Sequence, residues 1–212
     1  MRQIRQDLWE TQSYSPFPGL TTHSYLWTPP SGQNVLFYSP GNDAEFDDLQ
    51  KLGGVARQYL SHQDEAGPTL AAVAERFGAR LYASAVEVPQ VSKFATVHVP
   101  LEDRHVDDLG IEVIPTPGHT EGSICYLVPG ADGMRYLFTG DTLYVGEDGR
   151  WNAGYLPQFS DAEALASTLK LLATLEPDLV ASSADGGGGG AHLLEGTPWS
   201  DCVDEALARL KA

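Results

Sequence analysis

Short apolar runs of two kinds alternate along the chain. In the first kind, apolar and aromatic residues stand side by side between turn-forming residues, which is typical of buried strands. The strands predicted in this way cover residues 24–27, 35–38, 58–60, 80–83, 111–115, 123–128, 136–139 and 178–182.

In the second kind of run, apolar residues recur every three or four positions, as they do along one face of a helix. Leu70, Val73 and Phe77 follow this spacing between Pro68 and Gly78, which favour the start and the end of a helix. Further helices are predicted at 46–52, from a capping box at 160–163 to Pro177, and from 200 onward. Strands and helices alternate throughout, so the pattern predicts an α/β (α+β) fold with helices covering a sheet core.

Composition narrows the class of protein. The chain has 212 residues, of which 42% are hydrophobic and 20% charged, and we expect one globular domain over residues 1–212. Acidic residues outnumber basic ones by 29 to 13, which gives a formal net charge of −16. A surface this negative repels phosphate groups, so the charge argues against nucleic acid and anionic membranes as partners. A small-molecule substrate fits this balance, and the oligomeric state stays open.

The chain's surroundings can also be inferred. Its first residues are polar and include acids, unlike a signal peptide, and no apolar stretch is long enough for a membrane helix. Cys125 and Cys202 are the two cysteines, too few and too far apart for a disulfide framework. We therefore expect a cytoplasmic protein.

Three residues stand where strands give way to loops. His62 follows the predicted strand at 58–60, His119 lies in the Pro–Gly-containing loop TPGHTEGS at 116–123, and Asp141 follows the apolar strand at 136–139. Side chains at strand ends point into a shared edge of a sheet, and imidazole and carboxylate groups are metal ligands. Each segment alone is a weak signal, because most single histidines have no such role.

Taken together, these segments resemble the metallo-β-lactamase fold superfamily, in its glyoxalase II-like branch. The loop at 116–123 is similar to the family's TPGHTxGS loop, the segment at 138–143 to its GDTL segment, and 61–67 to its HxHxDHxGG loop. The resemblance extends from about Thr22 to the last helix. It implies a four-layer αββα sandwich, with a metal site along one edge.

The resemblance also implies a ligand set, position by position. His62, Asp64, His119 and Asp141 fall on metal ligands of the family, and Asp64 is expected to be catalytic as well. Other positions depart from the family pattern. Leu60 and Glu65 stand where two histidines belong, and the stretch containing Ala184 and Asp185 lacks the family's last histidine. The strand ending near Tyr38 also lacks a usual aspartate.

Two site arrangements follow from these departures. One is a mononuclear site of His62, His119 and Asp141, a donor set that suits zinc or iron(II). The other adds a carboxylate-rich second position from Asp64, Glu65 and Asp185, which suits harder ions such as Mn²⁺. We expect Zn²⁺, as one ion or two, with Fe²⁺ and Mn²⁺ as alternatives.

Three functions remain open at this stage. The first is a metal-dependent hydrolase that acts on a small molecule through a metal-bound water. The second is a catalytically inactive binding protein (a pseudoenzyme), and the third is a single-iron oxidoreductase on the same fold. Leu60 lies two residues before His62, so on an extended segment both side chains share a face. We therefore expect Leu60 to fill the volume of the missing imidazole.

Overall fold

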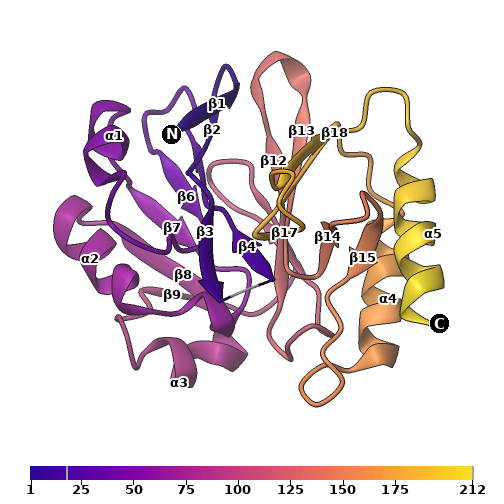
Figure 1. Cartoon of the computed structure of the whole chain (residues 1–212). Helices are drawn as coiled ribbons and strands as arrows, with labels where there is room; N and C mark the ends of the chain where they lie inside the picture. The colour runs from indigo at the N-terminus through magenta and orange to yellow at the C-terminus, as the bar shows by residue number, and fades with distance from the viewer. Residues whose placement is uncertain (18, 212) are drawn as a thin grey trace.

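Two mixed β-sheets lie face to face in the computed structural model, which describes residues 1–17 and 19–211 (Figure 1). The first sheet has the order β1 (Arg2–Arg5), β2 (Leu8–Glu10), β5 (Tyr25–Trp27), β6 (Val35–Phe37), β7 (Arg57–Tyr59), β8 (Arg80–Ser84) and β9 (Val99–Leu101). The second has the order β10 (His105–Val106), β11 (Glu112–Pro115), β12 (Ile124–Pro129), β13 (Arg135–Gly140), β16 (Leu179–Ser182) and β18 (Ala191–Leu193).

Two smaller sheets complete the strand pairing. One joins β3 (Tyr14–Phe17), β4 (Leu20–Thr22) and β17 (Ala184–Asp185), and the other joins β14 (Leu143–Val145) to β15 (Trp151–Ala153). In the first large sheet β6, β7, β8 and β9 run parallel, and in the second β13 and β16 do. The carboxyl ends of β6, β7, β8 and β9 therefore meet at one edge.

Helices cover the outer face of each large sheet, as Figure 1 shows. They are α1 (Phe46–Lys51), α2 (Pro68–Phe77) and α3 (Val88–Val91) on the first sheet, and α4 (Ala162–Leu172) and α5 (Trp199–Leu210) on the second. The chain thus has the expected α/β fold, a four-layer αββα sandwich. Among the described residues, no helix is long and apolar enough to cross a membrane.

The central core lies between the two sheets and is rich in aromatic rings. Phe37 of β6 stacks on Phe138 of β13, with ring centroids 3.9 Å apart. Tyr25 packs edge-on against the same Phe138 ring. Aromatic pairs of this kind add to the free energy of simple burial, so they fix the distance and angle between the sheets.

Helix ends follow the sequence signals only in part. Gly78 ends α2 in the left-handed conformation, as predicted. At α4, however, the cap is Asp161, whose carboxylate accepts hydrogen bonds from the N–H groups of Glu163 and Ala164. The Ser160 hydroxyl donates to the His119 carbonyl at 2.8 Å instead.

The apolar pattern did not predict several short elements. They include the strands β1, β2, β3 and β4 near the N-terminus and the helix α3. These elements have three or four residues each, and β1 is half exposed, so their apolar periodicity is too brief to stand out.

We expect Phe138→Ala to lower the free energy of unfolding by about 3–5 kcal/mol, because it removes a fully buried ring that three other aromatic rings contact. Urea denaturation measures the change. Phe159→Ala is the matched control, since that ring is 79% exposed and its loss should change stability by no more than about 0.5 kcal/mol. Equal effects of the two substitutions would contradict this account of the core.

Candidate metal centre

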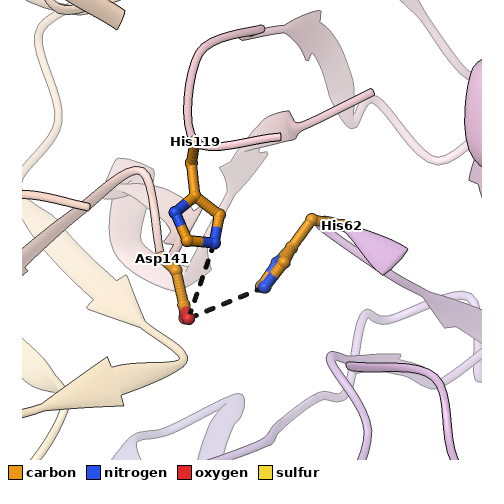
Figure 2. Close-up of side chains that lie close together, drawn as sticks. All are labelled: His62, His119 and Asp141. Carbon is orange, nitrogen blue, oxygen red and sulfur yellow. Dashed lines mark ion pairs between the residues drawn. The ribbon is translucent and has the colours of Figure 1, made fainter. Parts of the chain in front are cut away.

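His62, His119 and Asp141 meet at one edge of the sandwich (Figure 2). His62 follows β7 of the first sheet, whereas His119 follows β11 and Asp141 follows β13 of the second. The Nε2 atoms of His62 and His119 lie 3.6 Å and 3.9 Å from Oδ2 of Asp141. The two imidazole centroids are 4.7 Å apart, so the predicted proximity of these residues is confirmed. Their binding of a metal stays a prediction.

The orientation of His119 is fixed by a backbone carbonyl. Its Nδ1 lies 2.7 Å from the carbonyl oxygen of Gly154. Because a carbonyl oxygen only accepts hydrogen bonds, Nδ1 must carry the proton and neutral His119 keeps its lone pair on Nε2. That Nε2 is buried and has no hydrogen-bond partner. A Cβ at Gly154 would lie 1.9 Å from the Asp141 carbonyl oxygen, so only glycine fits here.

The loop that carries His119 is held from its other side by a buried carboxylate. The Thr120 hydroxyl donates to Oε1 of Glu87 at 2.5 Å, and the Gly122 N–H donates to the same atom at 3.3 Å. Glu87 is 3% exposed, and burial raises its pKa despite these hydrogen bonds. Nothing in the sequence around Glu87 indicated this contact, because the partners are more than thirty residues apart.

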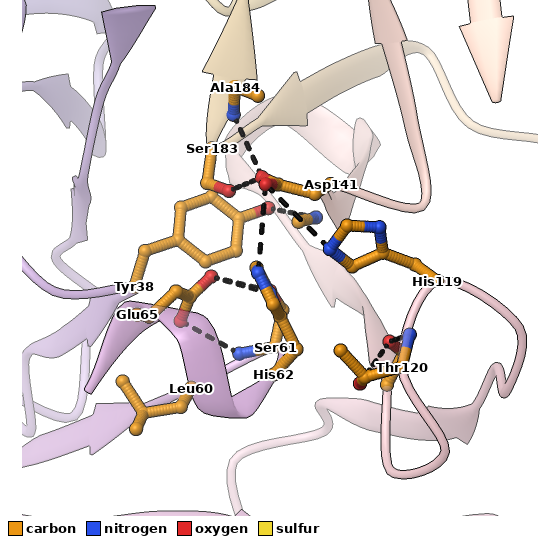
Figure 3. A network of polar contacts seen from close by, with 12 residues as sticks. Tyr38, Leu60, Ser61, His62, Glu65, His119, Thr120, Asp141, Ser183 and Ala184 are labelled. Atoms are coloured by element: carbon orange, nitrogen blue, oxygen red, sulfur yellow. Dashed lines mark hydrogen bonds and ion pairs between the residues drawn. The ribbon is translucent and has the colours of Figure 1, made fainter. Parts of the chain in front are cut away.

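The two oxygens of Asp141 have different surroundings. Oδ1 accepts hydrogen bonds from the Ser183 hydroxyl and from the Ala184 N–H, the latter at 3.2 Å. Oδ2 faces the two imidazoles (Figure 3). Protein donors therefore occupy one oxygen and leave the other for an ion shared with the histidines. Ser183 stands in the stretch that lacks the family's last histidine, and no sequence pattern indicated its contact with Asp141.

The acidic candidates for a second position are placed differently. Asp64 lies in a single 3₁₀ turn, Gln63–Glu65, where it is exposed and outside the group of three. Its roles as ligand and as catalytic residue stay predictions. The Glu65 side chain is 7% exposed, and its Oε2 accepts the Ser61 N–H at 3.0 Å.

Asp185 does not turn toward the other candidates. Its carboxylate lies 2.9 Å from Nε2 of His23 and accepts the N–H groups of Gly187 and Gly189 in the glycine run. His192, which follows the run, lies in β18 beside the Trp151 ring.

Leu60 lies elsewhere than the sequence predicts. It is 1% exposed and packs with Leu70, Leu81 and Val91 under α2 and α3. Figure 3 shows its side chain pointing away from the His62 ring and from Asp141. The expectation that Leu60 fills the volume of a missing imidazole is wrong, because an apolar cluster on the outer face of the sheet takes up the side chain.

Charges around the site move the two histidine pKa values in opposite directions. Burial alone would lower the pKa of His62, but the Asp141 charge and the Glu65 carboxylate outweigh it and raise the pKa to about 10. Burial lowers the pKa of His119, and the neighbouring His62 charge lowers it further. In the metal-free protein at neutral pH, His62 is therefore positive and His119 neutral.

The arrangement fits a single metal ion. Two ligands at tetrahedral positions, about 2.0–2.1 Å from zinc, lie about 3.4 Å apart. The ligand atoms of the group all lie within 4.8 Å of one another, so small side-chain shifts would complete the geometry. The unpartnered Nε2 of His119 is the buried polar atom that such an ion would satisfy.

Comparisons with known proteins bear on this site. A model of the metallo-beta-lactamase superfamily matches residues 64–184, more than half of the chain. A hydroxyacylglutathione hydrolase from Shewanella oneidensis is 31% identical over 203 residues, which cover 89% of this chain and 70% of that relative. Two further proteins of that name are matched over 61% and 59% of their length. The chain thus spans only part of these relatives.

Solved structures share the fold. A metallo-beta-lactamase from Pontibacter korlensis superposes with a TM-score of 0.76 at 16% identity and covers 99% of this chain and 97% of its own. ETHE1 from Myxococcus xanthus superposes with a TM-score of 0.62 at 24% identity and covers 90% and 85%. At these identities the likeness is one of fold alone.

We expect the two histidines of the metal-free protein to titrate far apart. Since the folded pKa of His62 is raised, its imidazolium adds stability below about pH 6.5, and this contribution is lost as pH rises toward 10. Nitrogen-15 correlation spectra across this range should show His62 still protonated when His119 is already neutral. Both rings titrating together near their ordinary pKa would contradict the electrostatics described here.

Proposed function

Because this chain belongs to the metallo-β-lactamase superfamily, we propose that it is a metal-dependent hydrolase with one ion held by His62, His119 and Asp141. The convergence of these three side chains from two sheets carries the proposal. The hydrolase relatives support the reaction class. Zinc is the proposed metal, because two imidazoles and one carboxylate are ordinary zinc ligands.

A single ion fits these residues better than two. Asp141 has one oxygen bound by Ser183 and Ala184, and the Glu65 and Asp185 carboxylates have partners of their own. Each would have to leave those partners to hold a second ion. The mononuclear arrangement needs no such rearrangement.

The bound ion would supply Lewis acidity, which activates a water for attack and polarises the substrate carbonyl. The chain's own residues set the geometry around it. The Nε2 atoms of His62 and His119 and Oδ2 of Asp141 come from three separate segments and face one another (Figure 2). Asp64 is an exposed carboxylate whose charge favours the protonated form of both His62 and His119, so it lies within electrostatic reach of the two rings. We assign it to accept the proton of the attacking water.

The substrate class follows from the relatives and from the rim of the site. The named relatives hydrolyse an acyl compound of glutathione, so a small acyl ester or thioester is the proposed class. Tyr155, Leu156 and Phe159 lie in the loop that follows Gly154 and are 38%, 46% and 79% exposed. The loop is tied to His119 through the Gly154 carbonyl and the Ser160 hydroxyl, so we assign these exposed apolar side chains to the acyl portion of the substrate.

One observation favours a second function. Two histidines and one carboxylate with open positions are also the ligand set of non-haem iron(II) oxygenases. A single-iron oxidoreductase is therefore the second candidate, and the metal bound by purified protein separates the two. A protein that takes up neither metal would instead be a binding protein on this fold.

We expect purified protein to bind one equivalent of zinc and to hydrolyse a thioester only when loaded. His119→Ala should lose both the metal and the activity, because it removes one of three ligands. Metal analysis by mass spectrometry and a thiol-release assay measure the two. His105→Ala, at an exposed histidine, is the control and should change neither. Full zinc occupancy in the His119 variant would contradict the assignment.

We expect Asp64→Asn to lower kcat about 10²–10⁴-fold while zinc content stays at one equivalent, since the carboxylate acts on the water rather than on the ion. Glu121→Gln is the matched control, because Glu121 is an exposed carboxylate next but one to His119. Loss of zinc from the Asp64 variant would make Asp64 a ligand instead and would argue for the second metal position.

A further inference from the structure

Behind His62, away from Asp141, lies a short chain of polar groups (Figure 3). Nδ1 of His62 is 2.8 Å from the Ser61 hydroxyl, and that hydroxyl donates to Oε1 of Glu65 at 2.5 Å. Oε2 of Glu65 accepts the Ser61 N–H at 3.0 Å. The Glu65 carboxylate also lies 3.4 Å from Nδ1 itself. All three side chains are buried.

The direction of these hydrogen bonds is fixed by chemistry. An ionised carboxylate only accepts, so the Ser61 hydroxyl must donate its proton to Glu65. The oxygen of that hydroxyl then accepts from His62, which places a proton on Nδ1. Once Nε2 is free of a proton, the ring holds its lone pair there, on the side of Asp141. When His62 loses its Nε2 proton, the neutral ring therefore has the tautomer that a metal ligand needs.

We propose that Ser61 and Glu65 are positioning residues, which hold the His62 ring and its Nδ1 proton so that Nε2 meets the ion. The proposal rests on the metal site of the proposed function. It gives Glu65 a role that fits its position in the motif. Glu65 stands where the metallo-β-lactamase superfamily has a third histidine. In this chain its carboxylate supports the ligand His62 through the Ser61 hydroxyl. Hydrogen-bonded partners of this kind raise ligand basicity and metal affinity.

The backbone next to Asp141 is shaped around Ser61. Gly140 has a φ of +55°, and a Cβ there would lie 2.0 Å from Oγ and 2.5 Å from Cβ of Ser61. The turn that carries Asp141 therefore packs directly on the serine. The Ser61 carbonyl also accepts the Ile124 N–H of the second sheet at 2.8 Å. Ser61, and with it the Ser61–Glu65 pair, is therefore held in position by contacts from the second sheet as well as from its own segment.

A purely structural role for the pair is the alternative, since Glu65 also ties the 3₁₀ turn to the Ser61 backbone. The two roles differ in what a substitution changes. Loss of a structural tie lowers the melting temperature of the metal-free protein. Loss of a positioning contact weakens zinc binding and alters the His62 Nδ1–H, whether or not the melting temperature falls.

The test measures zinc affinity by calorimetry in Ser61→Ala, Glu65→Gln and the double variant. We expect each single substitution to weaken zinc binding about 10–100-fold with the stoichiometry unchanged. The double variant should be no weaker than the worse single variant, because the two residues act in series. Ser39→Ala is the control, since its hydroxyl bonds to Thr69 and not to a histidine. It should bind zinc like the original protein.

A second readout needs no metal. The Nδ1–H proton of His62, held by Ser61, should give a protected NMR signal in the metal-free protein that shifts or vanishes in Ser61→Ala. Wild-type zinc affinity in both single variants, or an unmoved Nδ1–H signal, would overturn the positioning role. If Glu65→Gln does not fold, Ser61→Ala decides. If the original protein binds no zinc, the proposed function fails, and the Nδ1–H signal still tests the pair.

Discussion

The candidate site depends on the locked distance between the two sheets, because its ligands come from both. Aromatic packing sets this distance, and buried tyrosine hydroxyls fix the relative position of the strands. The Tyr38 hydroxyl donates to a carbonyl of β16 and accepts the Gly140 N–H, while the Tyr126 hydroxyl donates back to the Leu60 carbonyl. Burial raises the pKa of both tyrosines well above its ordinary value, so both hydroxyls stay protonated donors at physiological pH. Gly140 and Leu60 flank Asp141 and Ser61, so these crossings position the site itself.

Within this frame, the hydrogen-bond partners of His62, His119 and Asp141 decide which of their atoms remain free for an ion. Backbone and hydroxyl groups bind one nitrogen of each imidazole and one oxygen of Asp141. The atoms left without such partners are Nε2 of His62, Nε2 of His119 and Oδ2 of Asp141, and they face one another. The donor set is therefore selected by what the protein satisfies elsewhere. The Glu65 and Asp185 carboxylates are not free for an ion in this conformation, because both accept hydrogen bonds from protein donors.

Apolar periodicity predicted the α/β class, whereas the four-layer sandwich and the central group of residues were implied by the resemblance of three short motifs to a known family. Apolar runs marked the long strands, and the loops around His119 and Asp141 carry recognisable glycine and proline spacing. The supporting residues could not be predicted, since Glu87, Gly154 and Ser183 contact the site across more than thirty positions of sequence. The position of Leu60 was predicted wrongly because the alternation of side chains in a strand was assumed to continue from Leu60 through Ser61 to His62. This segment lies beyond the end of β7 and leads into a turn, where alternation no longer determines which side of the sheet a side chain faces.

The loop from Gly154 to Ser160 is tied to His119 at both ends, through the Gly154 carbonyl and the Ser160 hydroxyl. The exposed rings of Tyr155 and Phe159 and the His119 imidazole therefore lie on segments that are hydrogen-bonded to each other and are expected to move together. Any molecule that binds this conformation of the loop also stabilises the ring orientation that a ligand atom needs. Thermodynamic linkage makes the effect reciprocal, so occupation of the His119 nitrogen must order the loop by the same free energy. Under the proposed function, retention of the ion and affinity for an apolar molecule would then be coupled.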